Sequence, residues 1–481
     1  LDPWQKGELP DPPRPKGLAW LGVVGPGIIV LGASIGSGEF LLGPAAFVQY
    51  GLTLLWVTLV AVFLQTVLNT ELMRWTIATG EPVCIGFMRT WPSASFWAWF
   101  YAGLYFLQVG WPGWAGAAAG AVFFLFARDL AGPEHANVVY WIGVGTFVVC
   151  VTILLFGKRI ERTLEILNWI LVTLILSSFL VLALMFVSPD TWIAGLTGLV
   201  GYDPVTTSFR LMPSGVDYFL IGAFAAYSGA GGVTNLTLSN WARDKGYGMA
   251  GLAGYIPAAV GGKKVELTHT GFTFPVTPEA MQRWRGWWRI VRADQWGVYF
   301  VGAMFGMFLP AVLYVSFIEA GTDIRGLSVA AALADAMATR EGAIYGVVVA
   351  ILAVWVLFKT QLDILDGMTR AVTDLIWTGS RRIRAWKGGD VRVVYYGVLA
   401  AITIWGIIAL RLAQPIVLLQ LGANMAGIVF VVSSLHLLYI NTRLLPEALR
   451  PPMWRRASLV ATSLFYGAFV ILWVRGALGI G

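Results

Sequence analysis

The sequence predicts an all-α polytopic membrane protein with about eleven transmembrane helices. Apolar residues make up 58% of its 481 residues and charged residues only 12%, about half the charged share of an average soluble domain. The mean hydropathy is +0.73, and the apolar residues stand in long blocks that can each cross the hydrocarbon core of a bilayer. This composition excludes a soluble globular protein and a disordered chain. Two cysteines are too few for a disulfide framework or a thiolate metal site.

Eleven apolar blocks follow one another along the chain, and each is expected to form one span. They are residues 18–47, 52–79, 95–127, 138–156, 163–187, 215–242, 295–319, 343–378, 391–410, 413–441 and 456–478. The proline-rich segment 1–17 is expected to be an extended, poorly ordered cytoplasmic tail. Segment 188–214 is expected to be an extracytoplasmic linker, and 244–293 a cytoplasmic insert.

The distribution of basic residues predicts the orientation in the membrane. If the N-terminus is inside, most of the 33 Lys and Arg residues fall in inner segments, as the positive-inside rule requires. The outer segments then hold only Arg128, Arg210, Arg325, Arg340, Arg411 and Arg475. We therefore expect a cytoplasmic N-terminus, an extracytoplasmic C-terminus at Gly481, and a basic face that meets the lipid bilayer rather than nucleic acid.

The first and sixth blocks are interrupted where a plain helix should run. The first contains Ala33-Ser34-Ile35-Gly36-Ser37-Gly38-Glu39 and the sixth Tyr227-Ser228-Gly229-Ala230-Gly231-Gly232-Val233-Thr234-Asn235. Glycine weakens a helix, and a carboxylate within the membrane is costly. Close helix packing by small residues is the alternative interpretation. Interruptions at corresponding places in two halves are typical of inverted-repeat transporters.

An inverted repeat divides the chain into two halves. Five helices within 18–187 would be repeated upside down within 215–441, and the helix at 456–478 would be an addition. The broken helices would then expose free carbonyl groups and half-helix ends at the midplane. Such groups can hold a desolvated ion or a small solute.

Several segments resemble the Nramp divalent-metal transporters, which have a LeuT-type broken-helix fold. The family writes GPG, an interrupted helix, QYG, LLW and LQ in this order. The sequence has these letters at Gly25-Pro26-Gly27, Gln49-Tyr50-Gly51, Leu54-Leu55-Trp56 and Leu64-Gln65. Residues 235–239 and 413–421 are similar to the starts of the family's sixth helix after its break and of its tenth helix.

The resemblance also shows which metal ligands this chain lacks. The family's Asp-Pro-Gly-Asn break falls on residues 36–39, so the Asp is replaced by Gly36 and the Asn by Glu39. Its Met-Pro-His-Asn break falls on residues 232–235, so the Met is replaced by Gly232, whereas Asn235 remains. The family's carbonyl donor falls on Gly229 and its helix-ten glutamine on Gln420. Its acidic pair in helix three, associated with proton flow, falls near Gly113 and Gly116.

The remaining donors form an oxygen-only candidate site. It would consist of Glu39, Ser37, Asn235, Thr234, Gln420 and the carbonyl groups of Gly36 and Gly229, beside Gly232, with Glu39 and Asn235 as the metal ligands. Thioether sulfur selects softer metals, whereas oxygen ligands suit hard cations such as Mg²⁺. The same donors suit the ammonium group of a small organic solute. In the structural alternative, Glu39 pairs with Lys359 and takes no part in transport.

The eighth block carries a second polar pattern. Lys359, Asp363, Asp366, Arg370 and Asp374 recur at helical spacing, with opposite charges as neighbours. A row of ion pairs facing the bundle interior is the favoured interpretation. The functional alternative is a polar pathway, or a coupling-ion site, toward the cytoplasm.

The insert contains one segment with its own helical pattern. Basic and tryptophan residues recur at helical spacing through 278–292. This pattern predicts an amphipathic helix on the anionic inner leaflet. A docking surface for a cytoplasmic partner is the alternative.

Three functional hypotheses follow. The first is a secondary transporter of a hard divalent cation, the second a transporter of a small organic solute such as an amino acid, and the third a non-transporting scaffold or receptor. The sequence has no nucleotide-binding loop, nucleophile elbow or HExxH motif. We therefore expect neither an enzyme nor an ATP-driven pump, and no cofactor.

Overall fold

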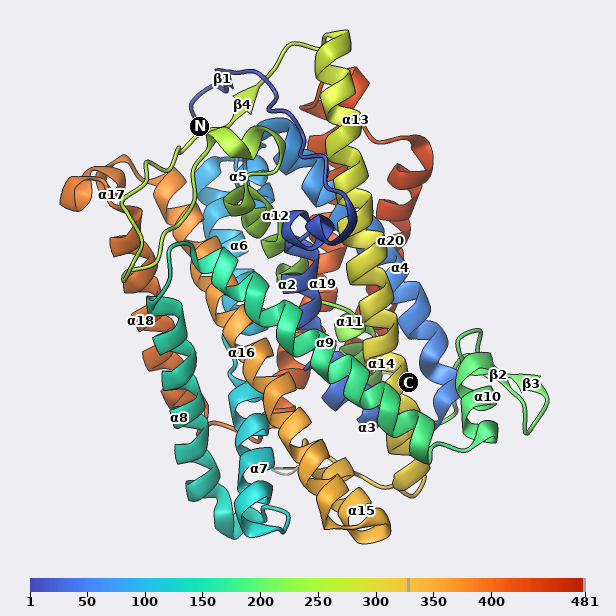
Figure 1. Cartoon of the computed structure of the whole chain (residues 1–481). Coiled ribbons are helices and arrows are strands. Elements are labelled where there is room, and N and C mark those ends of the chain that lie inside the picture. Colours follow the sequence, from blue (N-terminus) through green and yellow to red (C-terminus); the bar gives the residue numbers. More distant parts are fainter. Residues whose placement is uncertain (327–328, 479–481) are drawn as a thin grey trace.

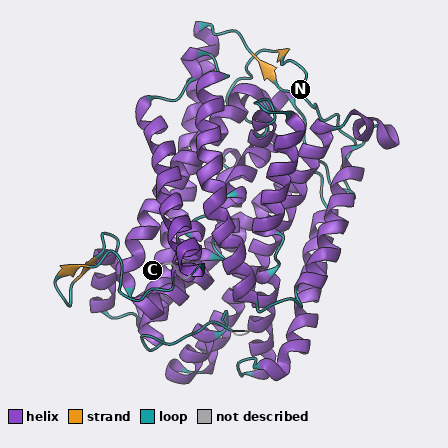
Figure 2. Cartoon of the chain, turned by 180° about the vertical axis from the view of Figure 1, so that it is seen from behind, coloured by secondary structure: helices purple, strands orange, loops and turns teal. Residues whose placement is uncertain are grey.

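The computed structural model describes residues 1–326 and 329–478, and helices dominate it (Figure 2). Within this described part, ten helical segments are long and apolar enough to cross a membrane. The sixth predicted span consists of two shorter helices, α11 (Tyr218–Tyr227) and α12 (Val233–Lys245). The prediction of an all-α polytopic membrane protein with about eleven spans is confirmed. Gly481 lies outside the described residues.

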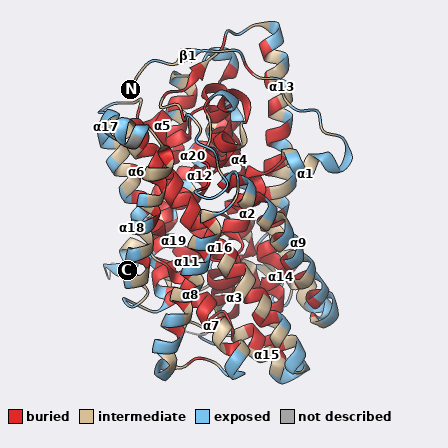
Figure 3. Cartoon of the chain, turned by 60° about the vertical axis from the view of Figure 1, so that its left-hand side comes forward, coloured by how far each residue is buried: buried red, intermediate tan, exposed pale blue. Residues whose placement is uncertain are grey.

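Seven spans are single helices. They are α4 (Leu55–Thr79), α8 (Ala136–Leu155), α9 (Ile160–Phe186), α16 (Ala343–Gly379), α18 (Val391–Ala409), α19 (Pro415–Arg443) and α20 (Met453–Ala477). The most apolar part of α8, α9, α18 and α20 is only 28% buried, whereas that of the first span is 100% buried. The first span is therefore central, and the other four present apolar side chains to lipid (Figure 3).

The first and third spans are divided. The first consists of α2 (Pro26–Ser34), the π-helical segment η2 (Gly38–Leu42) and α3 (Gly43–Tyr50), so it begins later than the predicted residue 18. The third consists of α6 (Ala94–Val109) and α7 (Gly113–Ala127). The span predicted at 95–127 is present as the segment Ala94–Ala127, but it is divided at Pro112, which lacks the N–H that an uninterrupted helix needs.

The seventh span is a continuous 40-residue helical segment. It joins α13 (Pro278–Arg292), the π-helical η6 (Ala293–Phe300) and α14 (Val301–Phe317). At 1.5 Å per residue it extends about 60 Å, twice the hydrocarbon thickness. The predicted helix at 278–292 is present, but it continues the span rather than lying flat on the membrane. Its Trp284 and Trp287 are buried within the protein.

The N-terminal tail packs against this insert. Strand β1 (Gln5–Lys6) pairs in parallel with β4 (Phe272–Thr273), and Leu9 is fully buried. The Trp287 indole N–H donates to the Pro10 carbonyl at 2.8 Å. The expectation of a poorly ordered tail is therefore wrong, because apolar contacts and backbone hydrogen bonds fix it to the insert.

The connections carry short elements. They are η1 (Gly17–Ala19), α1 (Trp20–Val23), η3 (Leu52–Leu54), α5 (Val83–Phe87), η4 (Pro133–His135), α10 (Pro189–Gly198), β2 (Tyr202–Asp203), β3 (Ser208–Phe209), η5 (Gly248–Leu252), α15 (Ala332–Glu341), α17 (Arg381–Ala385), η7 (Trp386–Gly388) and η8 (Glu447–Leu449). The N-terminus, α13 and α17 lie at one end of the molecule, and α15 lies at the other (Figure 1). The basic segments assigned to the inside thus gather at one end, while the orientation in the membrane remains a prediction.

Candidate functional site at the paired helix breaks

The first break frees backbone groups in the centre of the protein. Beyond Ser34 the regular helical hydrogen bonding stops, and the Gly36 N–H donates to the Ser34 carbonyl at 2.6 Å. The Gly32 carbonyl, left without its usual helical partner, instead accepts hydrogen bonds from the Lys359 ammonium and, at 3.1 Å, from the Thr360 hydroxyl. The Lys359 ammonium group thus lies at the C-terminal end of α2, where the helix dipole favours positive charge.

The sixth break depends on three glycines with positive φ. Gly229, Gly231 and Gly232 have φ values of 101°, 80° and 48°, which side chains with a Cβ rarely adopt. The chain turns away from α11 after Ser228 and re-enters the helical conformation at Val233. The glycines predicted from the sequence are therefore the residues that allow this helix to break.

Glu39 connects the two breaks. Its carboxylate Oε1 accepts from the Gly229 N–H at 3.3 Å, and its Oε2 accepts no hydrogen bond from the described residues although the side chain is fully buried. A Cβ at Gly38 would collide with the Tyr227 carbonyl, so only glycine permits the two breaks to approach this closely. The structure thus brings the predicted carboxylate and the predicted carbonyl donor residue together.

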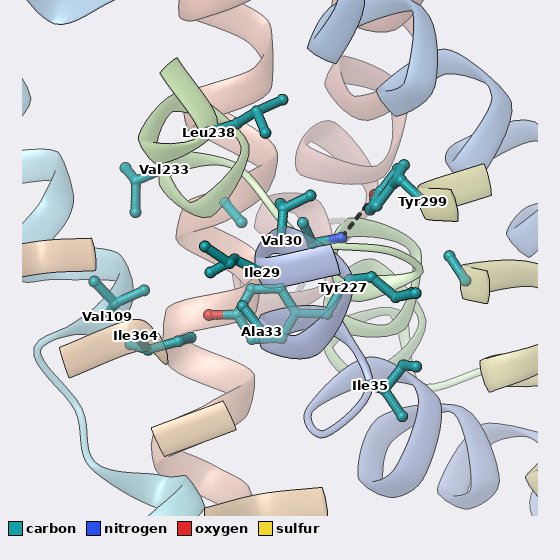
Figure 4. Close-up of a cluster of buried hydrophobic side chains, with 14 of the residues drawn as sticks. Ile29, Val30, Ala33, Ile35, Val109, Tyr227, Val233, Leu238, Tyr299 and Ile364 are labelled. Carbon is teal, nitrogen blue, oxygen red and sulfur yellow. Dashed lines mark hydrogen bonds between the residues drawn. The ribbon is translucent and has the colours of Figure 1, made fainter. Parts of the chain in front are cut away.

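Two side chains hold the first part of the sixth break, from Ser228 to Gly231. Gln65 on α4 donates to the Ser228 carbonyl at 2.7 Å and accepts from the Gly231 N–H at 3.3 Å. The Tyr299 hydroxyl of η6 donates to Gln65 Oε1 at 3.0 Å and accepts from the Ala230 N–H at 3.0 Å (Figure 4). The Tyr299 hydroxyl also interacts with the Asn235 side chain and with the charge of Glu39. Tyr299 therefore lies at the centre of the site.

A second glutamine holds the second part of the break, from Gly231 to Val233. Gln108 on α6 donates to the Gly231 carbonyl at 2.9 Å and accepts from the Val233 N–H at 2.8 Å. Sequence reasoning did not assign Gln65, Gln108 or Tyr299 to the site. Buried amides in apolar spans were the available signal, since a polar side chain within a membrane usually has a specific partner.

The other predicted site residues are buried but less closely connected. Asn235 donates to Asn69 Oδ1 at 2.9 Å, and its own Oδ1 accepts no hydrogen bond from the described residues. Ser37, Thr234 and Gln420 are also buried. Gln420 lies on α19, and within the described part of the chain no hydrogen bond joins it to Glu39 or Asn235. Gly36 and Gly232 contribute backbone shape, since a Cβ at either would collide with Thr360 or Gln108.

The polar row on α16 separates into two groups. Arg370 pairs with Asp366 at 2.8 Å and with Asp244 of α12, and Asp374 pairs with Arg243 at 2.9 Å. The expected ion pairs therefore form largely between α16 and α12 rather than along α16 alone. These groups fix the two helices together.

Lys359 and Asp363 contact α2 and α9 instead of α12. Asp363 Oδ1 accepts from Asn168 of α9 at 2.8 Å, and Lys359 contacts α2 as described. Lys359 has both Asp363 and Glu39 as electrostatic neighbours, but it forms no ion pair with Glu39 in the described structure. The structural alternative of a direct Glu39–Lys359 pair therefore lacks support.

The donor set determines what kind of ion the site suits. Among the described residues, no group of three or more His, Cys, Asp or Glu side chains could hold a metal ion. The site instead offers one carboxylate, amide and hydroxyl oxygens and backbone carbonyls. Hard cations accept such ligands and can retain water molecules.

Comparisons with known proteins identify the fold. No family model and no curated protein matches the chain. A structure of the Eremococcus coleocola manganese transporter covers 99% of this chain and 91% of its own, at 14% identity and a TM-score of 0.65. A second structure of that transporter, in complex with an aromatic bis-isothiourea substituted compound, has a TM-score of 0.55 at 15% identity and covers 97% of this chain and 90% of its own. MhsT in complex with L-phenylalanine has a TM-score of 0.51 at 13% identity and covers 96% of this chain and 99% of its own.

The chain is thus a multi-pass integral membrane protein with a broken-helix fold of the LeuT type. Within that class, its fold is similar to that of the Nramp-family manganese transporter. The resemblance inferred from the sequence is confirmed at the level of the fold.

Proposed function

We propose that the protein is a secondary-active transporter that moves a hard divalent cation, similar to Mg²⁺, through the paired breaks. The observation that carries this proposal is the position of Glu39, a fully buried carboxylate between two broken helices with one oxygen that accepts no hydrogen bond from the described residues. Leaving a carboxylate oxygen buried and unpaired is costly, and a bound cation would compensate that cost. The fold supports the proposal, since the similar solved structures are of transporters.

The ligand chemistry supports a hard cation over Mn²⁺ or Fe²⁺. Gly36 and Gly232 stand where the Nramp family has its Asp and Met ligands, so the site lacks one carboxylate and the sulfur. The other polar oxygens at the two breaks belong to Asn235, Tyr299 and the backbone. Oxygen ligands favour Mg²⁺ and similar ions, whereas thioether sulfur favours softer ones.

A small organic solute with an ammonium group is the alternative substrate. One carboxylate with an unpaired oxygen is sufficient to bind an ammonium group, and MhsT, which is similar in fold, was solved with L-phenylalanine. A non-transporting scaffold or receptor is the third possibility. Transport by the purified protein separates these three functions.

Purified protein in liposomes, screened for uptake of Mg²⁺, Mn²⁺, Ca²⁺ and a panel of amino acids, tests the proposal. We expect Mg²⁺ uptake that is reduced in Glu39→Gln and unchanged in the matched control Glu134→Gln, whose side chain is 69% exposed in the short helix η4. Uptake of an amino acid without any cation uptake would refute the substrate class. Absence of all uptake, from liposomes that contain correctly folded protein, would refute transport.

A further inference from the structure

A cavity of about 690 Å³ lies at the end of the molecule that holds the N-terminal tail. It is lined by Lys158, Glu161, Arg162, Glu165 and Lys245, among others. Its acidic residues belong to the first two turns of α9, which packs against both α2 and α16. The cavity therefore lies at the start of α9, and α9 runs from there across the molecule (Figure 1).

Two carboxylates stand together at this cavity. Glu161 and Glu165 are four residues apart on one face of α9, and both are buried. Glu165 accepts from Arg162 at 2.6 Å and pairs with Lys245. Glu161 Oε1 accepts no hydrogen bond from the described residues and is itself buried. Because Glu161 lines the cavity, this carboxylate holds a buried, unpaired oxygen beside it.

The next turn of α9 continues the polar face. Asn168 lies three residues beyond Glu165 and donates to Asp363 Oδ1 at 2.8 Å. Asn168 Oδ1 and Asp363 Oδ2 accept no hydrogen bond from the described chain. Both oxygens lie against the backbone of Gly32, where an added Cβ would collide with them. Lys359 also lies there, because its ammonium group donates to the Gly32 carbonyl.

We propose that these groups form two successive cation stations between the cavity and Glu39, a proposal that rests on the proposed transport function. The first station is Glu161 with Glu165, and the second is Asn168 with Asp363. All their donors are oxygen atoms, which suit a hard cation. Lys245 and Lys359 are tethered ammonium groups that balance the carboxylates while a station is empty. A passing cation replaces them as the partner of the unpaired oxygens.

This route differs from the pathway along α16 that the sequence suggested. Asp366 is paired with Arg370 on α16 itself, and Arg370 and Asp374 are paired with α12. A cation would have to break those pairs to pass. The polar face of α9 instead offers oxygens that are already unpaired. The inner half of the route therefore runs along α9 and reaches α16 only at Asp363.

Cysteine accessibility tests the two stations. In a Cys84→Ser, Cys150→Ser background, Glu161→Cys and Asn168→Cys are treated with a small cationic methanethiosulfonate reagent. Both should react, whereas the control Ile170→Cys, on the exposed apolar side of the same helix, should not, because the reaction needs water. Protection by Mg²⁺ is measured at Lys158→Cys, which lines the cavity and leaves all four station donors in place. Mg²⁺ at ten times its dissociation constant occupies a site about nine-tenths of the time and should slow this reaction about tenfold.

The outcomes separate this proposal from the transport function. An unreactive residue 168 in a folded variant, or reaction at 158 without protection by Mg²⁺, would overturn the stations. Reaction and protection in a protein that transports nothing would leave the stations in place and refute transport. As a second measurement that avoids cysteine, Glu161→Gln should lower Mg²⁺ uptake by about tenfold, whereas uptake equal to that of Glu134→Gln would contradict the first station.

Discussion

Replacing Glu39 by glutamine removes the charge at the junction of the two breaks and keeps the side-chain shape. The amide oxygen can still accept from the Gly229 N–H, which now lies 3.3 Å from Oε1. A bound divalent cation about 4 Å away would lose roughly 8 kcal/mol of Coulomb attraction at an effective dielectric of 20. Easier desolvation of the neutral amide offsets most of this loss. We therefore expect affinity to fall by about 1–3 kcal/mol, or about 5- to 150-fold.

Fold stability should change little in this variant. Lys359 donates to the Gly32 carbonyl and forms no ion pair with Glu39 in the described structure, so removing the Glu39 charge leaves no broken pair. If the two residues instead formed an essential pair, Glu39→Gln would lower the midpoint of thermal unfolding, and the double variant with Lys359→Met would restore it. Calorimetric titration with Mg²⁺ and thermal unfolding of the three variants measure both quantities. Unchanged Mg²⁺ affinity in Glu39→Gln would refute the role of Glu39.

The remaining predictions concern stability, orientation and selectivity. Gln65→Leu should leave several buried backbone groups of the sixth break unpaired, each costing about 1–3 kcal/mol. It should therefore lower the midpoint of thermal unfolding more than Gln65→Glu does, and equal midpoints for the two variants would contradict this account. Cysteine placed at Lys263 should resist an impermeant reagent applied outside intact cells, while cysteine at Gly481 should react; the opposite pattern would reverse the orientation. Because Gly36 and Gly232 supply neither carboxylate nor sulfur, Mn²⁺ should bind weakly and acid-driven Mn²⁺ uptake should be small; micromolar affinity by calorimetry would show that this reasoning is wrong.

The sequence predicted the spans and both central breaks because these depend on local composition. Apolar blocks of membrane length and glycines at mid-membrane depth are visible without knowledge of the fold. The carboxylate of Glu39 could be assigned for the same reason, since it is the only acidic residue within either break. Its contact with Gly229 depended on the expected pairing of the first and sixth spans.

The partners that hold the sixth break could not be predicted in this way. Gln65, Gln108 and Tyr299 come from three different spans, and their convergence depends on helix rotation and tilt rather than on local pattern. The proline-rich tail was wrongly expected to be poorly ordered because its composition does not reveal its partner. That partner is the insert, which supplies β4 and the buried Trp287.

The π-helical segment η6 places two distant functions on one helix. Asp294 accepts from the Gly25 N–H at 2.9 Å and the Gly27 N–H at 2.8 Å, so it fixes the start of the first span, whereas Tyr299 holds the sixth break. In an α-helix these two residues, five apart, would point about 140° away from each other. The i→i+5 bonding of a π-helix brings residues of this spacing toward the same side. The π-helical turn therefore fixes both contacts together. If η6 returned to a regular α-helix, either Asp294 would lose the start of the first span or Tyr299 would lose the sixth break.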